Sequence, residues 1–163
     1  MNWIANENME RLLKHFDDEQ YLDIPAIKVS ALRNLMFPEF RQVKDCIIIA
    51  KESALELEKE FDKALEMYFD KTEYEACNTE TRIDCFFESN ISMEQGFELA
   101  LLTLKAWTFQ LKLMQPDSKF CMIVSCDEDH TEIRFHKIHE GEKMWLCDNI
   151  NDYTEGAIGY FIV

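Results

Sequence analysis

The sequence has few residues that break regular structure, with only four glycines and three prolines among 163 residues. This scarcity leaves little room for flexible linkers and favours helices and strands joined by short connections. The apolar and charged fractions, 47 % and 30 %, are those of a globular protein rather than a disordered one. A chain of this length can also bury a sizeable core. We therefore expect a single domain over residues 1–163.

Paired cysteines are missing as well, because the six cysteines form no C-x-x-C motif. Most of them lie in apolar runs such as "DCIII" and "KFCMIVSC", where cysteine behaves as a small buried hydrophobe. The N-terminal "MNWIANENMERLLKHF" lacks the basic and apolar regions of a signal peptide, and no apolar run approaches a membrane span. We expect a reduced, cytoplasmic protein with no membrane partner.

Basic residues are scarce: 17 lysines and arginines stand against 32 acids, for a net charge of −15. This balance argues against direct binding of nucleic acid, which needs a basic face. A basic protein partner, by contrast, would be attracted over long range. Solubility is the other explanation that an acidic surface allows.

The spacing of apolar residues predicts the elements of the first half of the chain. One apolar face over residues 9–16 indicates a short helix, and the proline-punctuated segment 23–40 reads as a partly irregular connection. From about residue 40 to 68 the apolar positions recur in steps of three and four, which predicts one long amphipathic helix. Alternation in "TRIDCFFE", residues 81–88, predicts a strand.

The second half carries sharper signals. Ser92 and Gln95 form a capping-box signature for a helix that Pro116 ends. "KFCMIVSC" predicts a central strand, "TEIRFHKIH" the second arm of a hairpin, and "AIGYFIV" a last strand, while "DNINDYTEG" indicates a short helix or turn capped by Asp148. The order predicts an α+β fold, in which N-terminal and central helices pack against a mainly antiparallel sheet of about four strands.

Four side chains near the hairpin could in principle bind zinc, namely Cys126, His130, His136 and His139. However, residues three apart on a strand point to opposite faces, so His136 and His139 would converge only if the strand ended between them. No paired-cysteine knuckle accompanies them. We therefore assign no metal-ligating residue.

A cysteine nucleophile needs a thiolate-favouring setting with a histidine in reach, and Cys126 near His130 is the one candidate pair. A buried strand cysteine beside a turn histidine explains the same residues. The chain has no G-x-S-x-G, and its four glycines form no phosphate-binding loop. We assign no catalytic residue and expect no cofactor. A small cysteine-dependent hydrolase or transferase, or a regulatory adaptor subunit, remains as an alternative.

Acidic residues cluster around the predicted hairpin and the segment after it, and Trp145 lies among them. This tryptophan could anchor a partner, but we favour its role as a plug on the core together with Met144 and Leu146. An acidic rim beside an aromatic side chain suits a basic protein partner. The predicted partner-binding residues are Asp127, Glu128, Asp129, Glu140, Glu142, Trp145, Asp148 and Asp152.

Residues 118–163 resemble the tails of small bacterial immunity proteins of contact-dependent growth inhibition and related polymorphic toxin systems. The shared features are an apolar strand, the acidic turn "DEDH", the strand "IRFHK", a Trp-Leu step, the stretch "DNINDY" and a final apolar strand. The preceding helix "LLTLKAW" adds weaker support.

The resemblance implies a cytoplasmic, non-enzymatic protein that binds the C-terminal toxin domain of one effector. Many such toxins are nucleases with basic active sites, which an acidic inhibitor could cover and approach quickly. The resemblance supplies no catalytic or binding residue, so the predicted partner-binding residues rest on charge alone.

Overall fold

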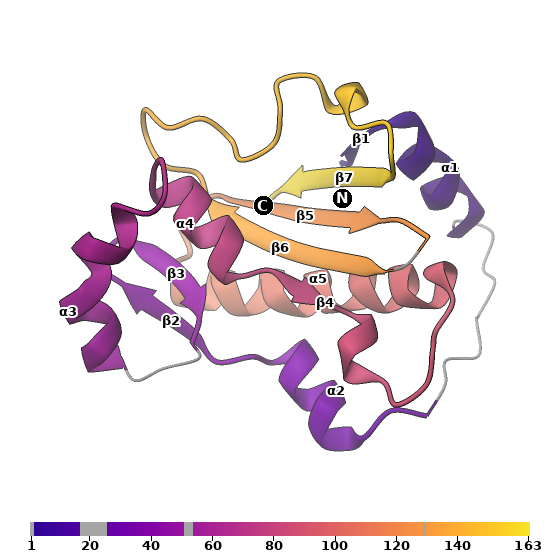
Figure 1. The fold of residues 1–163 in the computed structure, drawn as a ribbon, viewed down its shortest axis with the longest axis horizontal. Helices are drawn as coiled ribbons and strands as arrows, with labels where there is room; N and C mark the ends of the chain where they lie inside the picture. The colour runs from indigo at the N-terminus through magenta and orange to yellow at the C-terminus, as the bar shows by residue number, and fades with distance from the viewer. Residues whose placement is uncertain (1, 17–25, 51–53, 129) are drawn as a thin grey trace.

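The computed structural model describes residues 2–16, 26–50, 54–128 and 130–163 (Figure 1). Over these residues the chain forms an α+β fold, with five α-helices, a five-stranded antiparallel sheet and a separate two-stranded hairpin. The helices are α1 (Glu7–Phe16), α2 (Val29–Met36), α3 (Ala54–Leu65), α4 (Lys71–Asn78) and α5 (Met93–Met114), with short 3-10 helices η1 (Asp84–Phe86) and η2 (Ile150–Asp152). The strands are β1 (Ile4–Ala5), β2 (Phe40–Val43), β3 (Cys46–Ile49), β4 (Thr81–Arg82), β5 (Phe120–Cys126), β6 (Thr131–Lys137) and β7 (Ala157–Ile162). The predicted fold class is confirmed.

Strand β5 lies at the centre of the sheet, whose order is β1-β7-β5-β6-β4. Cys121 pairs with His136 of β6 on one side and with Ile162 of β7 on the other. Both faces of β5 are buried, with only Ser125 half-buried. The uninterrupted apolar run of this strand therefore suits its position, and the predicted central strand, hairpin and last strand are confirmed.

Helix α5 covers one face of the sheet, beneath β5 and β6 in Figure 1. The Ser92–Gln95 capping box begins it and the helix ends just before Pro116, as the sequence predicts, with Gln115 as its C-cap. Trp107 is fully buried and donates a hydrogen bond from its indole N–H to the Leu35 carbonyl at 2.9 Å, which joins α5 to α2. None of the described helices is both long and apolar enough to span a membrane.

The segment between β6 and β7 covers the other face of the sheet (Figure 1). Its buried Leu146 and Ile150 pack with Cys121, Ile123 and Ile158, which point away from α5. Both faces of the central strands are thus removed from water. The short helix in this segment is η2, and its N-cap is Asn149 rather than the predicted Asp148.

The long helix predicted over residues 40–68 is wrong. Residues 40–49 form the β2–β3 hairpin, and among the residues of this stretch that the structure describes, only those of α3 form an α-helix. The hairpin turns at Lys44, whose φ of 53° is left-handed. Steps of three and four also arise when two short strands flank a two-residue turn, and the β-branched run Ile47–Ile49 favours the strand.

Two further local predictions change. The strand expected over residues 81–88 is only β4, after which η1 turns the chain while Ile83 remains fully buried. The connection expected over residues 23–40 contains α2, whereas residues 17–25 lie outside the described part of the chain.

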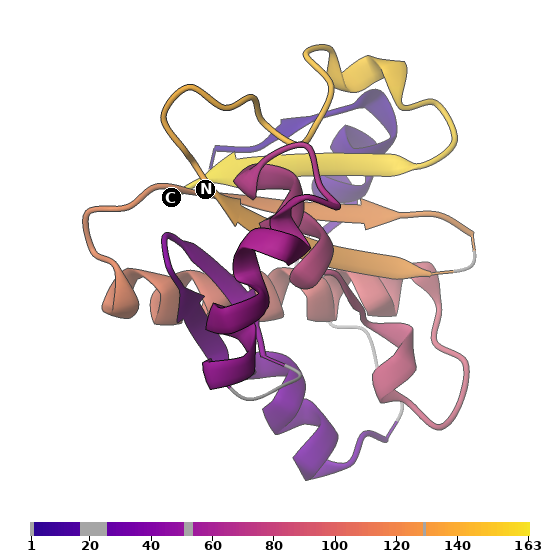
Figure 2. The same cartoon turned by 60° about the vertical axis from the view of Figure 1, so that its left-hand side comes forward.

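Side chains of α4 and of its C-cap residue, Thr79, replace a strand partner along the part of the β6 edge that β4 does not pair with. Thr79 Oγ1 accepts a hydrogen bond from the Phe135 N–H at 3.0 Å and donates one to the Phe135 carbonyl at 2.7 Å. Glu75 Oε2 accepts the Lys137 N–H at 2.7 Å. Figure 2 shows α4 lying across the end of the sheet where β6 ends, with the β2–β3 hairpin beside it. Because Glu75 Oε1 also accepts the Ile47 N–H at 2.5 Å, one carboxylate joins α4, β3 and β6.

Candidate functional site

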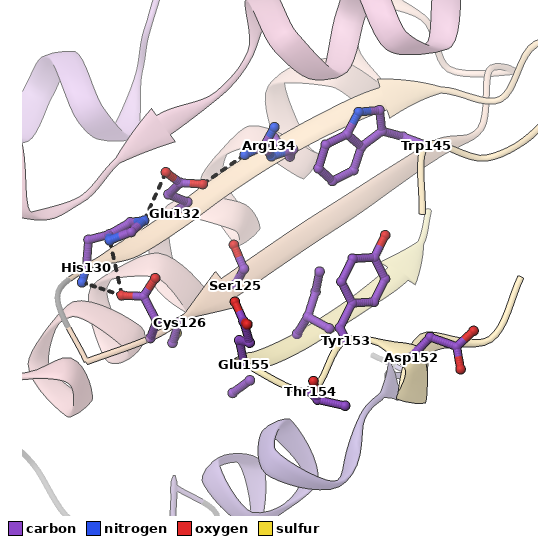
Figure 3. Close-up of a pocket in the computed structure, with 14 residues that line it drawn as sticks. Ser125, Cys126, His130, Glu132, Arg134, Trp145, Asp152, Tyr153, Thr154 and Glu155 are labelled. Atoms are coloured by element: carbon purple, nitrogen blue, oxygen red, sulfur yellow. Dashed lines mark hydrogen bonds and ion pairs between the residues drawn. The ribbon is translucent and has the colours of Figure 1, made fainter. Parts of the chain in front are cut away.

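A cleft opens at the end of the sheet where β5 ends and β7 begins (Figure 3). Its volume is about 510 Å³. Four carboxylates line it, against one guanidinium and one imidazole, so we call it the acidic cleft. Its lining residues are Ser125, Cys126, Asp127, His130, Glu132, Arg134, Trp145, Asp152, Tyr153, Thr154, Glu155, Gly156, Ala157 and Ile158.

A line of charged side chains crosses the acidic cleft along β6 (Figure 3). His130 lies between two carboxylates, with its Nδ1 3.1 Å from Asp127 Oδ1 and its Nε2 3.2 Å from Glu132 Oε1. Glu132 Oε2 then pairs with the Arg134 guanidinium at 2.8 Å. Positions 130, 132 and 134 meet on one face because side chains alternate along a strand. These ion pairs and hydrogen bonds hold the charged groups in fixed positions along the β6 side of the acidic cleft.

Trp145 contributes the aromatic surface of the acidic cleft. Its ring lies 4.3 Å from the Arg134 guanidinium carbon, a cation–π contact. The same side chain is half-buried and packs against the cluster of Leu146, Ile150 and Ile158. The structure therefore shows the packing that the plug interpretation predicts, while part of the ring still faces the cleft.

A second hollow of about 510 Å³ adjoins the acidic cleft and shares Asp127, Glu155 and Gly156 with it. Glu128 and Glu94 add carboxylates there, and Arg11 of α1 adds a positive charge. The two hollows form one acidic region at this end of the sheet. Sequence reasoning placed Asp127, Glu128, Trp145 and Asp152 among the partner-binding residues, and the structure brings these four together around it.

The other predicted acids do not join this region. Glu142 instead accepts hydrogen bonds from the Thr72 N–H at 2.9 Å and the Thr72 hydroxyl at 2.8 Å, at the start of α4. Burial raises the pKa of Glu142, but the hydrogen bonds from Thr72, the charge of His139 and a hydrogen bond from the Lys71 backbone together outweigh burial and lower it. Glu140 and Asp148 are exposed in the β6–β7 segment and line neither hollow. Asp129 lies outside the described residues.

Three charged residues of the acidic cleft were not predicted as partner-binding: Glu132, Arg134 and Glu155. The alternation along β6 carried the signal for the first two, because it places them on the face opposite Ile133 and Phe135. Glu155 depends on how the β6–β7 segment folds back over the sheet, which no local pattern indicates.

The candidate cysteine nucleophile is in the wrong environment. Cys126 is only 3 % exposed, and burial raises the pKa of its thiol to about 12. His130 is held by Asp127 and Glu132 rather than by the thiol. The four side chains weighed as zinc ligands also separate: His136 is buried beside the Lys137 carbonyl, and His139 contacts Glu75.

An apolar groove of about 730 Å³ lies between α2 and α5. Val29 and Phe37 are 83 % and 59 % exposed, and Leu102 of α5 is 44 % exposed. These side chains form a second surface, which is apolar where the acidic cleft is charged.

Comparison with known proteins identifies a family. The model of the Uncharacterized protein PM0498 family matches residues 4–161, nearly the whole chain, so the chain belongs to this family. No curated protein and no solved structure matches it. The family description adds no activity, substrate or partner to the geometry above.

Proposed function

We propose that this member of the PM0498 family is an immunity protein, which binds and neutralises a cognate bacterial toxin domain by protein–protein contact. The observation that carries the proposal is the acidic cleft with its adjoining hollow. Carboxylates line both at one end of a chain with a net charge of −15. A basic toxin domain, such as a nuclease whose active site grips phosphate, is the partner that this charge suits.

The cleft offers such a partner more than charge. Trp145 and Tyr153 supply aromatic surface between the acids, and tryptophan and tyrosine are enriched at the centres of interfaces. The Arg134 guanidinium packs over the Trp145 ring, which lowers the side-chain ordering cost of binding at this surface. Long-range attraction would speed association, and the ordered aromatic surface would slow dissociation.

The burial of Cys126 and the raised pKa of its thiol argue against the alternative of a cysteine-dependent hydrolase or transferase. A regulatory adaptor subunit is the second candidate. The apolar groove between α2 and α5 favours it, because a contiguous exposed apolar patch often marks an interaction site. An adaptor bound through this groove would show little dependence on salt.

The proposal is tested by capture and growth rescue. The immobilised protein is exposed to an extract of its native host and washed at rising salt, and the retained polypeptides are identified. We expect a basic C-terminal domain of a large secreted protein, which arrests growth when expressed alone in a test bacterium. Co-expression of this protein should restore growth.

Matched variants locate the surface responsible. Glu128→Lys with Glu155→Lys reverses two exposed acids of the acidic region, and Glu58→Lys with Glu60→Lys reverses two exposed acids of α3. Both pairs change the net charge from −15 to −11. Rescue should weaken for the first pair and persist for the second. Equal rescue by both pairs would place the interface elsewhere, and no rescue by the unmodified protein would contradict the proposed function.

A further inference from the structure

Three side chains with metal-binding donor atoms converge at the opposite end of β6 from the acidic cleft. Cys46 begins β3, Glu75 lies in α4 and His139 follows β6. One donor atom from each, a thiol sulfur, a carboxylate oxygen and an imidazole nitrogen, lies within 4.8 Å of the other two. Cys46 and Glu75 are 0 % exposed and His139 is 7 % exposed, so bulk water scarcely competes for these donors.

The Glu75 carboxylate is oriented before any ion arrives. Its two oxygens each accept one backbone N–H, from Ile47 at 2.5 Å and from Lys137 at 2.7 Å. A carboxylate offers about four lone-pair sites, so two remain for other contacts. The side chain is held by backbone groups of two different elements and need not reorganise to bind an ion.

The His139 ring lies between two carboxylates. Its Nε2 is 3.0 Å from Glu75 Oε2, and its Nδ1 is 3.4 Å from Asp45 Oδ2. A neutral imidazole carries one N–H and can donate to only one of them. If Nδ1–H faces Asp45, the Nε2 lone pair faces the Glu75 oxygen, and a cation between these two atoms removes the repulsion. A histidine oriented by a carboxylate on its far nitrogen is a common arrangement at metal sites.

Asp45 is itself held in place. Its carboxylate pairs with Lys137 Nζ at 2.6 Å and with Lys71 Nζ at 3.2 Å. These two ion pairs hold the Asp45 carboxylate beside His139 Nδ1. Asp45 therefore acts as a positioning residue for His139.

We propose that Cys46, Glu75 and His139 bind a zinc ion. Sulfur and imidazole donors suit zinc and disfavour magnesium and calcium, which take oxygen ligands. On binding, Cys46 releases its thiol proton to solvent. The thiolate and the carboxylate then balance the two positive charges of zinc, and the fourth position is left open. Zinc–ligand bonds of about 2.0–2.3 Å place tetrahedral ligand atoms roughly 3–4 Å apart, so the three donors need only a small closure.

The ion would join three elements that the sequence separates widely: the β2–β3 hairpin, α4 and the end of β6. Its expected effect is therefore on stability, independent of the acidic cleft and of the proposed function.

Cobalt(II) reports directly on the ligands. The protein is treated with a chelator under reducing conditions, desalted, and titrated with cobalt chloride in an absorption cell. We expect saturation at one equivalent, a thiolate-to-cobalt charge-transfer band and visible bands of a tetrahedral site. Zinc should then displace the cobalt and raise the melting temperature. Cys46→Ser should abolish the charge-transfer band, whereas Cys147→Ser, which removes an exposed thiol outside the cluster, should keep it.

Absence of the charge-transfer band in the unmodified protein, or its persistence in Cys46→Ser, overturns the site and leaves His139 with its contact to Glu75 alone. Circular dichroism checks that Cys46→Ser is folded. If Cys46→Ser is unfolded, X-ray absorption of the zinc-loaded unmodified protein tests the ligands instead. The proposed site predicts one sulfur and two or three nitrogen or oxygen neighbours around zinc. A spectrum without sulfur rejects it.

Discussion

Cys126 and His130 lie four residues apart, yet they belong to different environments. The thiol of Cys126 packs in the main core and accepts a weak contact from the Thr131 hydroxyl at 3.6 Å. The His130 ring lies at the edge of the acidic cleft between Asp127 and Glu132. Cys126 pairs with Thr131 and shares its face of the sheet, so the preceding residue, His130, points to the opposite face. Sequence spacing alone could not distinguish this arrangement from a catalytic pair.

Alkylation separates the six thiols. We expect iodoacetamide at mildly alkaline pH to modify the exposed Cys77, Cys85 and Cys147 of the native protein. Cys121 and Cys126 should react only after unfolding, because burial raises the pKa of both thiols to about 12 and also blocks access. Peptide mass mapping measures the result. Rapid modification of native Cys126 near neutral pH would restore the cysteine-enzyme alternative.

His136 should remain neutral under mildly acidic conditions. It is fully buried, and burial lowers its pKa below 6.5, although the hydrogen bond with the Lys137 carbonyl opposes this shift. The unfolded chain takes up a proton as the pH falls through 6.5 while the folded chain does not. The contribution of His136 to stability therefore decreases toward acid. NMR titration of its imidazole resonances should give a pKa below 6.5, and a value at or above 6.5 contradicts the buried neutral ring.

Among the elements, those with local signals were predictable. The capping box at Ser92 and the stop near Pro116 bound α5, and the apolar run of β5 identified the central strand. The β2–β3 hairpin was not predictable in this way, because its apolar spacing matches a helix face as well. What decides for the hairpin is the left-handed turn at Lys44 and the burial of Ile47 in the main core.

The two candidate sites also differ in whether a local sequence pattern predicts them. The wall of the acidic cleft formed by Glu132 and Arg134 follows from alternation along one strand. The cluster of Cys46, Glu75 and His139 draws on three elements, and no pattern in the sequence links these positions. His139 was considered as a metal ligand on sequence grounds, but with the wrong neighbours, because only the tertiary fold brings Glu75 to it.

The open edge of β6 gives a stability prediction. Thr79→Val removes the hydroxyl that both accepts from and donates to the Phe135 backbone, while it preserves the shape of the side chain. Thr79 is fully buried, so the Phe135 groups would be left unpaired. We expect the free energy of unfolding, measured by urea denaturation, to fall by about 1–3 kcal/mol.

Thr108→Val on α5 is the matched control. The Thr108 hydroxyl is inaccessible and has no hydrogen-bond partner among the described residues. Removing it should leave stability unchanged or slightly raised. Equal losses in the two variants would mean that Thr79 does not replace a strand partner at this edge.

At the scale of the whole molecule, a net charge of −15 creates a long-range field, and the acidic region at the end of β5 gives this field a place to act. At the opposite end of the sheet, α4 and the β2–β3 hairpin pack against β6 (Figure 2). Charge far from an interface affects every encounter weakly, whereas charge at the interface affects its own partner strongly. A charge reversal within the binding surface should therefore change association with the partner more than an equal reversal elsewhere, and this comparison distinguishes a binding role of the acids from a role in solubility.

The measurement that tests the central claim most directly is the association rate constant with the captured toxin domain, followed over a series of salt concentrations. The unmodified protein should associate fastest at low salt and lose this advantage as salt rises. Glu128→Lys with Glu155→Lys should slow association and flatten the salt dependence, whereas Glu58→Lys with Glu60→Lys should change both far less at the same net charge. Indistinguishable rates for the two variants would contradict binding at the acidic cleft.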